Sequence, residues 1–164
     1  MKLTVLGASI VVMLLAVEVG MRLFIPVTDV PFQFWDPLVG VRRIPNQTGR
    51  CLSGGYIDAP YHFNAQGWNH PDDYVTVKQP AARRVCVVGD SFVEAMHVSH
   101  EQSFFGVAEK KMSRPDRPVQ WYAFGCSGFG PTHESLVIHH YALDYRPDVV
   151  VMVFIANDPW DSSI

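Results

Sequence analysis

The stretch that decides the fold is Val85-Cys86-Val87-Val88-Gly89-Asp90-Ser91-Phe92. Its four consecutive apolar residues predict a buried parallel strand, and the Gly-Asp pair that follows ends it. Ser91 is therefore expected at the carboxyl end of the strand, where ligands and reacting groups gather in open α/β sheets. A serine held on a tight turn at that edge is a candidate nucleophile. The alternative is that Ser91 only caps the next helix.

Strands and helices alternate after this turn. The strands are predicted over 85–88, 119–124 and 149–155, and the helices over 100–112 and 133–145. Ser99 with Gln102 offers a capping box for the first helix, and Thr132 is the expected cap of the second. A β-α-β-α-β order predicts an α/β fold with a parallel sheet, right-handed crossovers and helices on both faces.

Each predicted strand is followed by a polar loop, and the three loops are expected around one crevice because parallel strands end at the same edge. The second loop is Gly125-Cys126-Ser127-Gly128 and the third is Asn157-Asp158. Acyl transfer needs an activated hydroxyl and donors aimed at the developing oxyanion. Ser91 can supply the hydroxyl and its own amide. Gly128 can offer a second N–H, and Asn157 a side-chain amide.

In this order on successive strands, these three motifs resemble the first three blocks of the SGNH (GDSL-type) hydrolases, which are esterases, lipases and O-acyltransferases. The resemblance implies a flavodoxin-like three-layer α/β/α fold with Ser91 as the nucleophile. It also implies an oxyanion hole formed by the Ser91 amide, Gly128 and Asn157, with supporting positions at Gly89, Asp90 and Asp158. The expected substrate is a small-molecule or glycan ester, and neither a cofactor nor a metal ion is expected.

The chain departs from the family pattern in two places. Ile155 stands where many members have the glycine of Gly-x-Asn-Asp. The family takes its base from an Asp-x-x-His motif, which occurs nowhere in this sequence. We therefore expect the amino-terminal part of an SGNH protein, with about three strands and little or no activity, since an unassisted serine is a poor nucleophile. Surface or packing roles are expected for the histidines that could substitute: His97, His133, His139 and His140.

The amino terminus, residues 1–26, predicts a transmembrane helix. About 23 mostly apolar residues follow Lys2, which is enough to span a bilayer. Glu18 and Arg22 interrupt the run near its end, at a spacing that allows them to pair. A cleaved signal peptide is the alternative, but Glu18 occupies the critical cleavage position. We favour a single-pass signal anchor in a bacterial inner (cytoplasmic) membrane, with the rest of the chain extracytoplasmic.

Residues 27–80 are predicted to form an irregular, aromatic-rich approach segment, and 81–164 the first part of the hydrolase domain. This segment is similar to that of membrane-anchored bacterial members. Its aromatics are expected to pack on the α/β core, with a sugar-binding surface as the alternative: Phe32, Phe34, Trp35, Tyr56, Tyr61, Phe63 and Trp68.

The three cysteines give little information about the redox compartment or the function of the chain. Cys86 is expected in the core, and Cys51 could pair with Cys126 in an oxidising compartment. No Cys/His spacing predicts a zinc site.

The composition excludes one class of partner. The net charge is −3 and no run of Lys and Arg occurs, so the sequence lacks the basic surface that nucleic acid binding requires. Two other functions stay open. One is a non-catalytic, membrane-anchored binding or assembly protein that holds an acylated or glycan ligand. The other is a flavodoxin-like binder of a phosphate cofactor, which the absence of a glycine-rich phosphate loop disfavours. The oligomeric state is not predicted.

Overall fold

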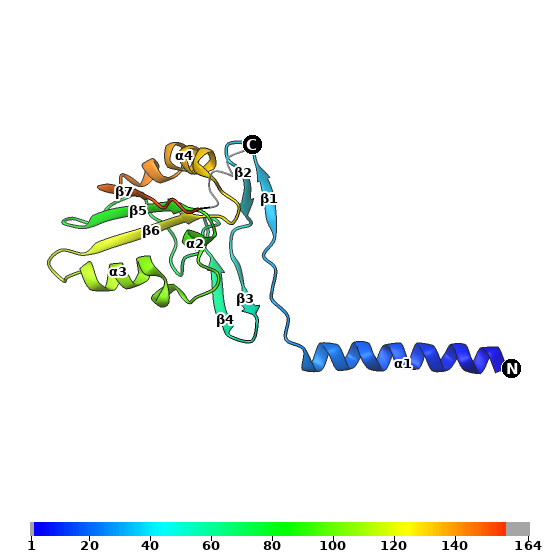
Figure 1. Ribbon diagram of the computed structural model, residues 1–164. Coiled ribbons are helices and arrows are strands. Elements are labelled where there is room, and N and C mark those ends of the chain that lie inside the picture. The colour runs from blue at the N-terminus through cyan, green and yellow to red at the C-terminus, as the bar shows by residue number, and fades with distance from the viewer. Residues whose placement is uncertain (1, 157–164) are drawn as a thin grey trace.

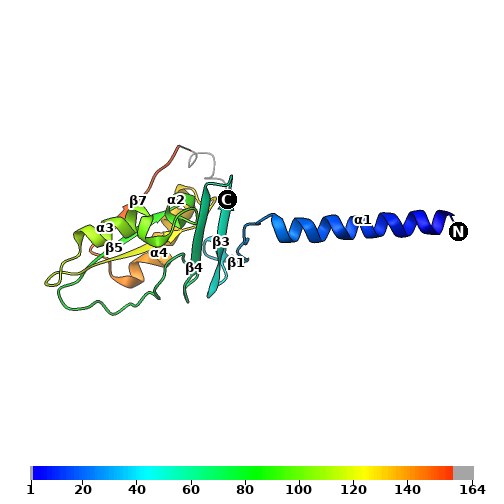
Figure 2. The ribbon, with the colours of Figure 1, turned by 90° about the horizontal axis from the view of Figure 1, so that it is seen from below.

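The computed structural model describes residues 2–156, and it begins with a helix that stands apart from the other elements (Figure 1). Helix α1, Lys2–Phe24, has no buried residue. Its Arg22 Nε lies 2.7 Å from Glu18 Oε1 on the exposed surface. The helix is long and apolar enough to cross a membrane. The view from below shows the same separation of α1 from the folded part (Figure 2).

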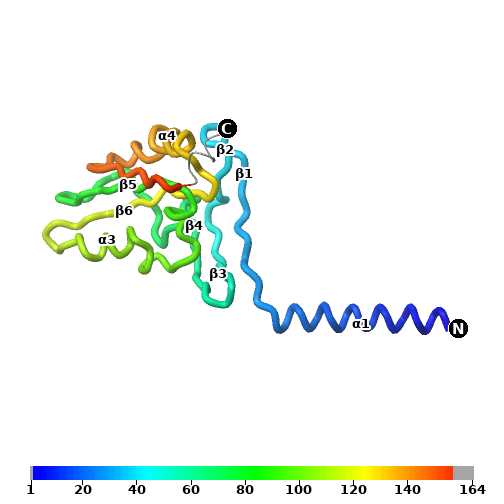
Figure 3. Tube along the Cα trace, in the orientation of Figure 1, coloured from blue at the N-terminus to red at the C-terminus, as the bar shows by residue number. Residues whose placement is uncertain are grey.

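Two antiparallel hairpins follow, where the sequence predicts an irregular segment. The strands are β1 Gln33–Asp36, β2 Gly40–Arg43, β3 Gln47–Ser53 and β4 Ile57–Phe63. β1 pairs with β2, and β3 pairs with β4 (Figure 3). Gly49 in β3 and Pro60 in β4 break the apolar alternation that would reveal strands in the sequence. The turn between β3 and β4 places Gly54 and Gly55 at positive φ.

The parallel sheet has the strand order β6-β5-β7. β5 is Arg83–Gly89, β6 is Val119–Gly125 and β7 is Val149–Met152. Helices α3, Phe104–Met112, and α4, Pro131–His140, lie on opposite sides of this sheet (Figure 1). The predictions of an α/β fold and a three-stranded parallel sheet are therefore confirmed within the described residues, but the third strand ends at Met152 and not at Ile155.

Side chains of the strands divide between two apolar clusters, one on each face. Val87 and Ala123 pack with Phe105 of α3. Val88 and Phe124 pack on the other face, with Val137 of α4 among other residues. The alternation follows from the period of two along a strand, and it requires continuous apolar strands because both faces are covered.

Several predicted helix ends are wrong. The segment predicted as one helix from residue 100 divides into η1, His100–Gln102, and α3, and the cap of α3 is Ser103, whose Oγ accepts the Gly106 N–H at 3.1 Å. Ser99 makes no capping hydrogen bond through its side chain. The second helix starts at Pro131 after Gly130, not after Thr132, and a separate turn η2, Ala142–Tyr145, follows α4. Proline at a first helical position lacks only an N–H that would have no partner in the helix.

All three cysteines are buried and free, so the Cys51–Cys126 disulfide is absent. Burial raises the pKa of the Cys86 and Cys126 thiols to about 12. Cys86 lies fully buried in the sheet, as predicted. At neutral pH these two side chains are protonated and behave as small apolar groups.

Within residues 2–156, side chains rather than another strand bond the outward N–H groups of β6. The N–H groups of Val119, Trp121 and Ala123 donate to Ser113 Oγ at 3.1 Å, Glu109 Oε1 at 3.3 Å and Tyr74 Oη at 2.8 Å, respectively. The Tyr74 hydroxyl also donates to the Ala123 carbonyl at 2.8 Å. These bonds satisfy backbone groups that would otherwise offer a template for strand pairing.

We expect Tyr74→Phe to lower the free energy of unfolding by about 1–3 kcal/mol, because it leaves buried backbone groups of Ala123 without their partner. The ring would keep its stacking on Tyr122, whose centroid lies 4.1 Å away. Denaturant unfolding of the full chain in detergent micelles measures the loss. Tyr56, which is 83% exposed, provides the control variant Tyr56→Phe. Equal effects of the two variants would contradict the role given to the Tyr74 hydroxyl.

Candidate functional site

The turn after β5 presents Ser91 as the first residue of the short helix α2, Ser91–Glu94. The cap of this helix is Asp90, whose Oδ1 accepts the Phe92 N–H at 2.9 Å. The alternative in which Ser91 is the cap is therefore wrong. Ser91 Oγ lies 3.5 Å from Asp90 Oδ2, at the outer limit of a hydrogen bond.

Two glycines allow α2 to lie directly against the strand ends. Gly89 of β5 and Gly125 of β6 are partners in the parallel register. A Cβ on Gly89 would lie 2.5 Å from Val93 Cγ2, and a Cβ on Gly125 would lie 2.8 Å from Glu94 Cα and still closer to the backbone N of that residue. The glycines of the first two motifs thus serve the close packing of this helix on the sheet.

We expect Gly125→Ala to destabilise the chain by about 1–3 kcal/mol or more, because the new methyl group meets backbone atoms that cannot rotate away. The control is Gly20→Ala in α1, where no atom lies within 4 Å of the added Cβ. The measurement is the denaturant midpoint of the full chain in micelles. A midpoint as high as that of the control would show that α2 can move away from β6 at little cost.

Ser91 borders a cavity of about 410 Å³. Its lining is mainly apolar, from Phe92, Val98 and Phe104, with polar contributions from His97 and Gln102. His97 is exposed and follows α2 closely in the chain. The structure thus brings one of the four histidines considered as a substitute base to the same cavity as Ser91.

Gly128 lies on the loop after β6, at the same edge of the sheet. The Phe129 N–H donates to the Cys126 carbonyl at 3.1 Å, which makes a turn with Gly128 at φ +86°. A left-handed residue at this turn position favours glycine. A Cβ on Gly128 would have no atom within 4 Å. Its surroundings are open, as an oxyanion donor needs.

Ser91 and Gly128 nevertheless border different cavities. Gly128 lines a cavity of about 330 Å³ together with Trp35, Gly40 and His133. The His133 ring stacks on Phe129, with centroids 5.3 Å apart. Asn157 and Asp158, the third predicted loop, lie outside the described residues.

Glu94 connects these two regions, and the sequence alone gave no sign of this role. Its side chain has no exposed area and receives Arg43 Nε at 2.6 Å from β2. It also accepts the Ser127 N–H at 3.1 Å and the Ser127 hydroxyl. Burial would lower the pKa of Arg43, but the hydrogen bond and charge of Glu94 outweigh burial and raise it. One carboxylate thus joins a hairpin, the helix of Ser91 and the loop of Gly128.

A second buried ion pair lies within the first hairpin and also contacts Tyr141, the residue that caps the end of α4. Asp36 Oδ2 lies 3.2 Å from Arg42 and accepts the Tyr141 hydroxyl at 2.5 Å. Burial alone would raise the pKa of Asp36, but bonds from Tyr141, the Leu38 amide and Arg42 lower it overall. The Arg42 guanidinium lies 4.6 Å from the Trp68 ring centroid and 4.3 Å from that of Tyr141.

The aromatics of the approach segment divide between core and surface. Trp68, Tyr61 and Phe63 are buried, as expected for packing residues. Three others are largely exposed: Phe32, Trp35 and Tyr56. The packing interpretation therefore holds for the first group.

No protein-family model matches the chain, and no curated protein matches it.

Proposed function

We propose that this chain is a membrane-anchored ester hydrolase or O-acyltransferase of the SGNH type, with a flavodoxin-like three-layer α/β/α fold. The observation that carries the proposal is the placement of Ser91. It begins a helix immediately after the central strand of a parallel sheet, it borders a cavity of about 410 Å³, and Asp90 rather than its own hydroxyl caps the helix.

In the proposed reaction the Ser91 oxygen attacks the carbonyl carbon of an ester, and the hydroxyl proton passes to a base. The carbonyl oxygen becomes an oxyanion, for which the Ser91 amide is the proposed donor at this cavity. Gly128, which borders a different cavity, and Asn157, which lies outside the described residues, are the further donors of the proposal. Collapse of this intermediate expels the alcohol, which takes up the proton, and leaves an acyl-serine. Water or a sugar hydroxyl then removes the acyl group.

His97 is the proposed base, because it lines the same cavity as Ser91. The exposed position of His97 keeps its imidazole in contact with water, through which a proton can be passed on. His133 lines the cavity of Gly128 instead, and therefore provides a matched control.

A fluorophosphonate probe tests the proposal on the full chain in detergent micelles. We expect covalent labelling that Ser91→Ala abolishes and that Ser53→Ala, at the end of β3, leaves unchanged. His97→Ala should slow labelling by at least tenfold, whereas His133→Ala should not. Absence of Ser91-dependent labelling in the folded chain would overturn the catalytic proposal. If an acylated glycan protected Phe92 or Phe104 from oxidation in a hydroxyl-radical footprint of that unlabelled protein, the result would favour the non-catalytic binding function.

A further inference from the structure

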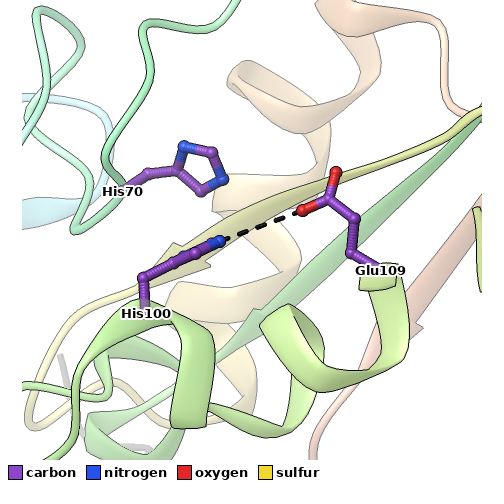
Figure 4. A group of neighbouring side chains, drawn as sticks. All are labelled: His70, His100 and Glu109. Atoms are coloured by element: carbon purple, nitrogen blue, oxygen red, sulfur yellow. Dashed lines mark ion pairs between the residues drawn. The ribbon is translucent and has the colours of Figure 1, made fainter. Parts of the chain in front are cut away.

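Two histidines and a glutamate from three separate segments meet beside the outer edge of β6. His70 lies in the loop after β4, His100 begins η1, and Glu109 belongs to α3 (Figure 4). One ligand atom of each lies within 4.8 Å of the others. We propose that these three side chains form a binding site for a divalent first-row transition-metal ion, with Zn²⁺ as the probe ion.

His70 supplies the strongest argument. The residue is 5% exposed, and its Nε2 is buried without a hydrogen-bond partner among the described residues. Nδ1 lies 3.0 Å from the Asp72 carbonyl oxygen and 3.1 Å from the Asp72 amide nitrogen, so Asp72 offers it both an acceptor and a donor. In the tautomer with the proton on Nδ1, the carbonyl holds the ring as a backbone acceptor commonly does for metal-binding histidines, and the lone pair of Nε2 is available to an ion. Figure 4 shows one ring nitrogen of His70 directed toward the other two side chains.

Glu109 is held with one oxygen toward the site. Its Oε1 accepts the Trp121 N–H at 3.3 Å, while Oε2 lies 3.9 Å from His100 Nε2. This separation is too long for a hydrogen bond, whereas ligand atoms around a tetrahedral zinc ion lie roughly 3.3 Å apart. Small side-chain movements would therefore bring the donors to coordination distance.

The alternative is a purely structural stack. The His70 and His100 rings are nearly perpendicular, with centroids 4.6 Å apart, and a protonated His100 would pair with Glu109. That arrangement leaves His70 Nε2 buried and unsatisfied, which costs free energy. A bound metal ion would give Nε2 a partner and so remove this free-energy cost. Two imidazoles and one carboxylate are also the protein ligands of some zinc enzymes and of non-haem Fe(II) centres.

An approach path exists on one side. A cavity of about 320 Å³ is lined by His100 together with His62 and Asn69. His100 and Glu109 keep 20% and 31% of their side-chain area exposed. None of the three proposed ligands lines the Ser91 cavity, so metal occupancy and the labelling of Ser91 are separate readouts.

Isothermal titration of the tag-free, EDTA-treated full chain with Zn²⁺ in detergent micelles tests the proposal. We expect one ion per chain and a rise of several degrees in the unfolding temperature. His70→Ala, His100→Ala and Glu109→Gln should each weaken binding at least tenfold. The control replaces His139 and His140 of α4 by alanine, which removes as many imidazoles elsewhere.

Visible absorption of bound Co²⁺ gives a second readout that depends on the ligand set. It should appear with the native chain and the control, and disappear with His70→Ala. Glu109→Gln keeps an oxygen for the Trp121 N–H, so it distinguishes lost coordination from lost folding. Absence of binding to the native chain, or equal affinities across native chain, ligand variants and control, would overturn the proposal.

Discussion

Replacing Glu94 by glutamine is expected to lower the free energy of unfolding by about 3–5 kcal/mol, because it leaves a buried guanidinium without its counter-ion. Arg43 has only 10% of its side-chain area exposed, so water cannot replace the lost carboxylate. The amide also loses the charge that receives two hydrogen bonds from Ser127. Equilibrium unfolding in denaturant, followed by tryptophan fluorescence in micelles, measures the change.

The control is the ion pair of Arg50 and Asp58, whose side chains are 59% and 57% exposed. Exposed pairs contribute about 0–1 kcal/mol, so Asp58→Asn should have little effect. A double-mutant cycle with Arg43→Met should show that the second substitution recovers part of the loss, since it removes the stranded charge. A cost for Glu94→Gln no larger than that of Asp58→Asn would contradict the role of Glu94.

Trp68→Ala is expected to cost about 3–5 kcal/mol, the usual range for emptying the place of a buried aromatic residue. Trp68 is 2% exposed and lies edge-on to Phe124, with ring centroids 5.2 Å apart. The Arg42 guanidinium lies over the Trp68 ring. The substitution therefore opens a cavity where the hairpins meet the sheet, and it removes a cation–π contact as well.

The control is Trp35→Ala, the same substitution at a residue that is 72% exposed. Trp35→Ala should change the free energy of unfolding by no more than about 0.5 kcal/mol, as surface substitutions usually do. If both variants unfolded at the same denaturant concentration, the hairpins would not be packed on the sheet through Trp68.

The sheet could be predicted because its signal is local. Continuous apolar runs identify β5, β6 and β7, and the strand order of a right-handed α/β unit places Ser91 at the carboxyl edge. The hairpins could not be found in this way. Gly49 and Pro60 interrupt their alternation, and their stability depends on contacts such as that of Arg42 with Tyr141, which join distant parts of the chain.

The candidate site was predicted only in part for the same reason. A serine at the end of a strand has a local pattern, whereas Glu94 gains its contacts from Arg43, which is 51 residues away in the sequence. His70, His100 and Glu109 match no metal-binding spacing, because three different segments carry them. Their convergence depends on the packing of α3 and the loop after β4 along β6.

The side chains that cover β6 also restrict how molecules of this protein can associate. Strand addition needs free backbone groups, and the outward N–H groups of Val119, Trp121 and Ala123 in β6 are already bonded to Ser113, Glu109 and Tyr74. Within residues 2–156, no strand pairs with the outer side of β7, where Val149 and Met152 are 47% and 42% exposed. The β6 side of the parallel sheet is therefore the less favourable of its two edges for strand addition.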